Sequence, residues 1–85
     1  MKLEEIRQRI DVVDDKICEL LEERFTLCKE VANAKKESGV AVENKDREKA
    51  VIKSVRAKMP DELKDYTEKV FLLLIEESKD LQKKL

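Results

Sequence analysis

Three basic residues fall on a line of the chain where apolar side chains are expected. Helical steps of three and four residues from Leu21 reach Arg24 and Lys35 in one direction and Arg7 in the other. The complete line is Arg7, Ile10, Asp14, Ile17, Leu21, Arg24, Cys28, Val31 and Lys35. Because burying an unpaired cation is costly, this line predicts acidic partners on another helix, side chains that reach out to water, or a bound anion.

Polar residues on the apolar faces of the later segments favour the bound anion. The apolar line near the end of the chain continues through Ser78 and Gln82, and the line before it extends backward to Glu48 and Asn44. Each residue alone has an ordinary structural explanation, such as a packing hydroxyl, a surface amide or a helix cap. Together with the basic residues they indicate a small polar pocket for a compact ligand with two carboxylates, which Arg binds through paired hydrogen bonds.

The elements that position these residues are predicted to be helices. The chain has 85 residues with one glycine and one proline, which favours an all-α fold, and its length suits a single domain over residues 1–85. Gly39 is suited to end a first helix, Asn44 to cap a second, and Pro60 to open a third. We expect helices over residues 3–37, 44–59 and 60–84.

The first predicted helix is too long for a chain of this size to cover. About 35 residues form a rod of roughly 50 Å, whereas a compact chain of this length has a radius of gyration of about 12 Å. Apolar residues follow this helix from Leu3 to Val31. A second copy of the same stripe is the simplest cover, so we expect a two-fold helical homodimer.

Composition excludes several other classes of partner and site. Lys and Arg (19) nearly balance Asp and Glu (20), which argues against a general nucleic-acid or anionic-membrane surface. No run is long and apolar enough for a signal peptide or a transmembrane helix, so a cytoplasmic location is expected. With no His, and with Cys18 and Cys28 about 15 Å apart on one helix, neither a metal site nor a disulfide is expected.

Five short motifs occur in order along the chain: I-R-x-x-I-D-x-x-D near the start, L-L-x-x-R and V-A-x-x-K in the first helix, D-R-E at the start of the second, and I-E-x-S-x-x-x-Q in the third. In this order and spacing the chain resembles the all-helical class of chorismate mutases over nearly its whole length. The resemblance implies an intertwined homodimer of three-helix chains. It also implies an isomerase that converts chorismate to prephenate, in phenylalanine and tyrosine biosynthesis, without a cofactor.

The resemblance also implies roles for individual residues. Arg24 and Lys35 would bind the substrate carboxylates, Arg7 would reach the site from the partner chain, and Lys35 and Gln82 would contact the ether oxygen. The remaining implied substrate contacts are Glu48 and the backbone of Asn44 at the ring hydroxyl, Ser78 beside a carboxylate, and Arg47 in the same region. Many relatives carry Asp in place of Asn44, so the resemblance implies a backbone contact at this position and leaves the role of its side chain open.

The reaction explains why no nucleophile, base or metal stands among these residues. It is an intramolecular rearrangement, so fixed cations and hydrogen-bond donors need only hold the reactive conformer and stabilise the charge that develops on the ether oxygen. Two alternatives stay open. One is an isochorismate pyruvate lyase of the same fold, which product analysis would distinguish, and the other is a helical dimerisation module without catalysis.

Overall fold

The protein is all-α in its computed structural model, which describes residues 2–39, 41 and 43–85, so residues 1, 40 and 42 of the predicted domain lie outside the described part. The elements in chain order are α1 (Leu3–Ser38), α2 (Lys45–Ala57), a short 3-10 helix η1 (Asp61–Leu63) and α3 (Lys64–Lys83). The predicted fold class is therefore confirmed. None of the described helices combines the length and the apolar content needed to cross a membrane.

The connection between α1 and α2 has the two caps that its sequence predicts. Gly39 takes the left-handed conformation (φ 72°), and its N–H donates to the carbonyls of Lys35 and Lys36 at the end of α1. The side chain of Asn44 caps α2 by accepting a hydrogen bond of 3.0 Å from the N–H of Arg47. Both caps satisfy backbone groups that the helix itself leaves unpaired.

The connection between α2 and α3 differs from the predicted direct start of a helix at Pro60. Pro60 instead precedes η1, and its carbonyl accepts from the N–H of Leu63 at 2.9 Å, so α3 begins only at Lys64. The Lys64 ammonium donates to the carbonyl of Arg56 at 2.6 Å and to that of Met59 at 2.9 Å. Lys64 thus satisfies carbonyls at the end of α2 while it starts α3.

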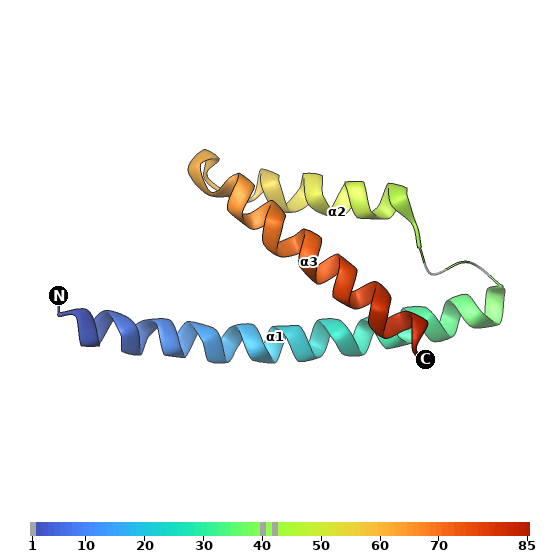
Figure 1. The fold of residues 1–85 in the computed structure, drawn as a ribbon, viewed down its shortest axis with the longest axis horizontal. Coiled ribbons are helices and arrows are strands. Elements are labelled where there is room, and N and C mark those ends of the chain that lie inside the picture. The colour runs from blue at the N-terminus through green and yellow to red at the C-terminus, as the bar shows by residue number, and fades with distance from the viewer. Residues whose placement is uncertain (1, 40, 42) are drawn as a thin grey trace.

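The three helices form an open arrangement in which α3 runs diagonally between the other two (Figure 1). Among the described residues, α3 packs against both α1 and α2, whereas α1 and α2 do not contact each other. The molecule measures 54 × 25 × 16 Å with a radius of gyration of 15.9 Å, compared with about 12 Å for a compact chain of this length. The N-terminal half of α1 therefore extends beyond the packed region.

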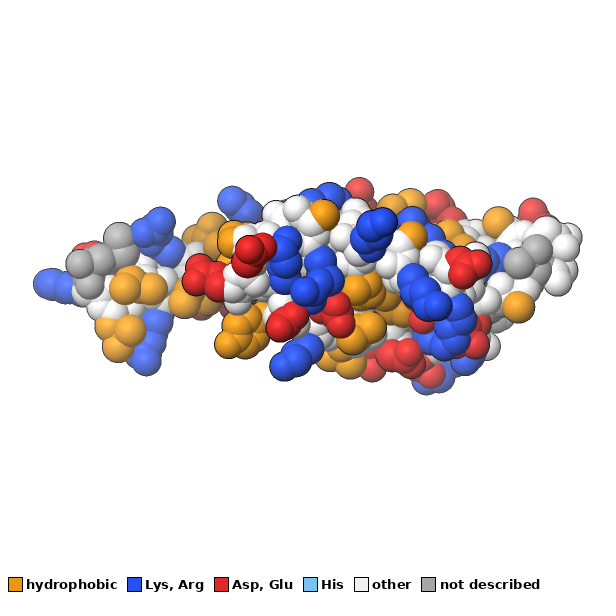
Figure 2. Space-filling model, turned by 90° about the horizontal axis from the view of Figure 1, so that it is seen from above, with side chains coloured by type: hydrophobic (Ala, Val, Ile, Leu, Met, Phe, Trp, Pro, Cys, Tyr) orange, Lys and Arg blue, Asp and Glu red, His pale blue; other side chains and the backbone are white. Residues whose placement is uncertain are grey.

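The chain buries little of its apolar surface by itself. Only Ala32 and Ile75 are buried among the described apolar residues, and along α1 Leu3 and Leu20 are about three-fifths exposed (60% and 64%). The accessible surface is 7029 Å², whereas a compact monomer of 10.0 kDa exposes about 5,200 Å². Apolar side chains stand uncovered at the α1 end of the molecule, at the left of Figure 2.

Candidate active site

A cavity of about 180 Å³ lies where α1, α2 and α3 converge. Seven of the eight site residues predicted from the sequence line it: Arg24, Lys35, Asn44, Arg47, Glu48, Ser78 and Gln82. The other lining residues are Cys28, Val31, Val51, Ile75 and Lys79. Residues separated by more than fifty positions in the sequence thus meet at one small cavity, because α3 crosses α1 near its C-terminal half.

Arg24 is fixed at the α1–α3 crossing by a serine of the opposite helix. Its Nη1 donates to Ser78 Oγ at 2.7 Å, and Ser78 Oγ donates in turn to the carbonyl of Leu74 at 2.7 Å. Ser78 is buried, with 6% of its surface exposed. Because a guanidinium carries five N–H donors, this contact orients Arg24 and leaves other donors for a ligand. Ser78 thus holds the Arg24 guanidinium against α3.

Gln82 is held at the same crossing through its amide nitrogen. Nε2 donates to the backbone carbonyl of Cys28 at 3.0 Å, and the residue is buried, with 9% of its surface exposed. A carbonyl can only accept, so this contact determines which end of the amide faces α1. The amide nitrogen has a second N–H, which the Cys28 contact does not use.

The remaining predicted residues line the cavity from the end of α1 and the start of α2. Lys35 is half-buried in the last turn of α1, whereas Arg47 and Asn44 are exposed. The Asn44 side-chain oxygen caps α2 by accepting from the N–H of Arg47.

Arg7 is the predicted site residue that does not line this cavity. It is exposed in the N-terminal part of α1, 17 residues before Arg24, which corresponds to about 25 Å along the helix. Within one chain, Arg7 and Arg24 are therefore too far apart to bind the same small molecule.

Lys79 is the charged lining residue that the sequence reasoning missed. Its ammonium contacts carboxylate oxygens of Glu76 at 3.0 Å, Glu43 at 3.2 Å and Glu48 at 3.4 Å. Hydrogen bonds to Glu76 and then Glu43 raise the pKa of Lys79 above its ordinary value. The pKa of Glu43 is lowered, first by Lys45 and then by Lys79. A helical step of four residues from Ile75 was the available signal, since it places Lys79 on the inner face of α3.

The charges of the cavity suit an anionic ligand. Arg24, Lys35, Arg47 and Lys79 line it with a single carboxylate, that of Glu48. Lys79 is surrounded by acidic neighbours, whereas Arg24, Lys35 and Arg47 add positive charge to the cavity, which suits a ligand with two negative charges. Among the described residues, no cluster of three or more His, Cys, Asp and Glu side chains could hold a metal ion.

Comparison with known proteins gives the same family at two levels. The sequence profile of the family described as chorismate mutase type II matches residues 6–83. A chorismate mutase of Methanocaldococcus jannaschii is 39% identical over 84 residues, which cover 96% of this chain and 85% of the relative. No solved structure matches the chain significantly.

Proposed function

The chain belongs to the chorismate mutase type II family, and we propose that it converts chorismate to prephenate at the described cavity, in a site completed by a second copy of the chain. The observation that carries the proposal is the convergence of Arg24, Lys35 and Gln82 on one small cavity. Two of these residues are cations and the third is a neutral hydrogen-bond donor. This combination suits a dianion in which negative charge develops at a third position during the reaction.

Substrate binding is assigned to the cations. Arg24, oriented by Ser78, binds one carboxylate with its remaining N–H donors, and Lys35 lies in the same cavity. Holding both carboxylates keeps the substrate in the compact conformer in which its reacting carbons meet. The rearrangement needs no proton transfer, so this restriction of freedom contributes directly to the rate.

Transition-state stabilisation is assigned to Lys35 and Gln82. As the C–O bond breaks ahead of C–C bond formation, negative charge grows on the ether oxygen. The Lys35 ammonium and the second N–H of Gln82 are the two donors that we assign to this oxygen. Because the Cys28 carbonyl already holds the Gln82 amide in place, little reorganisation is needed when the charge appears.

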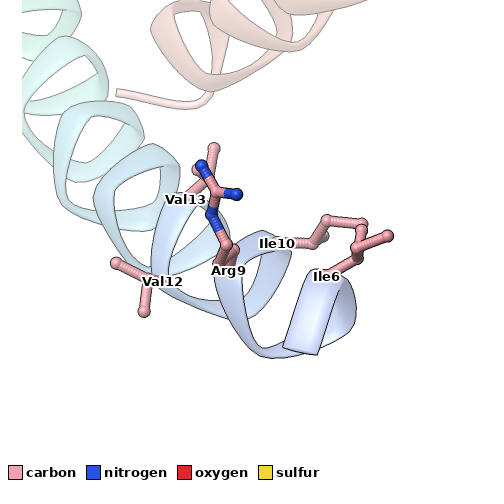
Figure 3. A pocket seen from close by; sticks show the side chains of 5 residues that line it. All are labelled: Ile6, Arg9, Ile10, Val12 and Val13. Atoms are coloured by element: carbon pink, nitrogen blue, oxygen red, sulfur yellow. The ribbon is translucent and has the colours of Figure 1, made fainter. Parts of the chain in front are cut away.

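A homodimer is supported by the surface that one chain leaves uncovered. An apolar hollow is formed by Ile6, Arg9, Ile10, Val12 and Val13, all of which belong to α1 (Figure 3). The chain exposes about 1,800 Å² more surface than a compact monomer of its mass, and an ordinary stable interface buries about 800 Å² per partner. The surface that one chain leaves uncovered is thus as large as an interface with a second copy requires.

The position of Arg7 is explained by the same dimer. An antiparallel arrangement of two α1 helices brings the N-terminal half of one beside the C-terminal half of the other. Arg7 of the partner subunit then approaches the cavity that contains Arg24 and Lys35. Each dimer has two such sites, and each site draws Arg7 from one chain and its other residues from the other chain.

Subunit mixing tests the shared site. An Arg7→Ala chain and an Arg24→Ala chain, each inactive alone, form a heterodimer in which one site carries both lesions and the other site carries neither. After random exchange, activity should return to about a quarter of the wild-type value. A matched mixture of Arg24→Ala with Lys35→Ala should recover nothing, since both residues belong to the same chain's site. Folded, exchanged heterodimers of the first pair without activity would rule out the shared site.

Product analysis tests the reaction itself. Purified protein should consume chorismate, which is measured by the loss of chorismate absorbance. The product should be prephenate alone. Release of pyruvate from isochorismate at a higher kcat/KM would instead identify a lyase. Saturable dimerisation without turnover of either compound would identify a non-catalytic module.

A further inference from the structure

Lys79 joins three parts of the chain beside the cavity. Its partners are Glu76 on α3 itself, Glu48 on α2, and Glu43 in the segment that leads into α2. The side chain of Lys79 is 12% exposed, and that of Glu48 is 22% exposed. Lys79 is thus largely buried and has three carboxylate partners, unlike an ordinary surface lysine. This arrangement holds a cation directly against a carboxylate of the cavity wall.

The two oxygens of Glu48 have different surroundings. Oε1 accepts from Lys79 at 3.4 Å, whereas Oε2 is buried and has no hydrogen-bond partner among the described residues. A buried acceptor without a donor is rare in folded proteins, because the lost hydration is not replaced. Glu48 lines the cavity, so a ligand hydroxyl is the donor that would satisfy this carboxylate.

We propose that Lys79 is a positioning residue that holds Glu48 in place, so that Glu48 accepts a hydrogen bond from a hydroxyl group of the bound substrate. The inference rests on the proposed function, which places a hydroxyl-bearing dicarboxylate in the cavity. Lys79 does not bind the substrate itself. Its three carboxylate neighbours offset its charge, so its effect is transmitted through Glu48.

The chemistry of the cavity shows why Glu48 needs such a partner. It is the one carboxylate among the described lining residues, and its ligand is an anion that would repel it. The positive charge of Lys79, which binds Glu48 Oε1, offsets the repulsion between Glu48 and the ligand. The raised pKa of Lys79 agrees with this role, because the ammonium stays charged throughout the neutral range. Without Lys79, Glu48 is free to turn away from the ligand.

A double-mutant cycle tests whether Lys79 acts through Glu48. Lys79→Met keeps most of the aliphatic stem and should raise KM for chorismate about tenfold with kcat changed less than about twofold, because a hydroxyl contact serves ground state and transition state alike. In the Glu48→Gln background the same substitution should change KM less than about twofold. Lys79→Arg, which retains the cation, should restore KM to near the wild-type value.

Controls separate this role from general stabilisation. Lys84→Met removes an equivalent charge from the end of α3, where Lys84 pairs with Asp80 on the surface, and should leave KM unchanged. Lys79→Gln serves as the second variant if Lys79→Met does not fold, with helicity and oligomeric state measured for both. Equal effects of Lys79→Met with and without Glu48 would overturn the inference while leaving the proposed function intact. Absence of turnover in the wild-type protein would overturn both.

Discussion

The side chains assigned to the ether oxygen differ in charge, and their substitution should separate two contributions to the rate. Lys35→Ala removes a donor and a cation, whereas Gln82→Ala removes a donor alone. We expect Lys35→Ala to lower kcat by about 10² to 10³ and Gln82→Ala to lower it less. Turnover of chorismate at saturation is the measurement. Near-normal kcat for Lys35→Ala would contradict electrostatic stabilisation by this residue.

The ion pair between Lys79 and Glu43 should make the contribution of Lys79 to stability depend on pH. The pKa of Glu43 is lower in the folded protein than its ordinary value of 4.5. The ion pairs of Glu43 therefore stabilise the fold at pH values above 4.5, and this stabilisation is lost as the pH falls through the pKa of the folded protein. The raised pKa of Lys79 means that its contribution is present below 10.5 and is lost only at higher pH. Urea unfolding should therefore show Lys79→Met less stable than wild type at neutral pH, with a difference that shrinks as the pH is lowered below 4.5. A difference that does not change with pH would show that the effect does not come from the ion pair with Glu43.

Individual residues also show what the sequence could and could not predict about the site. The line of helical steps from Arg7 to Lys35 predicts that Arg24 and Lys35 share one face, because their spacing on a single helix is fixed by helical geometry. Lys79 was missed because its significance depends on Glu43 and Glu48, which α2 and its leading segment bring close only in the folded chain. The Arg24–Ser78 contact likewise depends on how α3 crosses α1, which periodicity does not determine.

At the scale of elements, the predicted helices differ from the observed ones mainly at the α2–α3 connection. Local signals predicted Gly39 and Asn44 as caps because each satisfies backbone groups of its own helix. Pro60 was predicted to open a helix directly, but a 3-10 turn comes first. The Lys64 side chain bridges to carbonyls near the end of α2, and this contact between two elements was not predictable from either alone.

The end of α1 offers a test of backbone strain. Gly39 has φ 72°, and an added Cβ would meet no atom within 4 Å, so substitution introduces conformational strain without a clash. Gly39→Ala should lower the free energy of unfolding by about 1 kcal/mol, and Gly39→Asn by less, because Asn tolerates the left-handed region better. Urea unfolding of the three proteins at equal concentration checks this order. Equal stability of Gly39→Ala and wild type would show that this turn adapts to the substitution.

At the scale of the whole molecule, the exposed stripe of α1 ties stability to concentration. If two chains cover each other's stripe, the unfolding midpoint should rise as protein concentration increases. Sedimentation should show a dimer at micromolar concentration, and specific activity should fall on dilution below the dissociation constant. An active monomer under these conditions would contradict the dimer and the contribution of Arg7 from the partner subunit.

The composition of the buried region bears on how this protein can change by mutation. The four buried positions among the described residues are Ala32, Ile75, Ser78 and Gln82, so two of the four are polar and line the cavity. Gln82→Leu should therefore raise the thermal midpoint, since an apolar side chain suits that position better, while lowering kcat by about 10². A melting curve and a turnover assay on the same sample measure both effects, and a lower midpoint would show that the Gln82 amide also stabilises the fold. Selection of this chain for thermal stability alone should therefore replace the polar residues at positions 78 and 82 with apolar ones, at the expense of turnover.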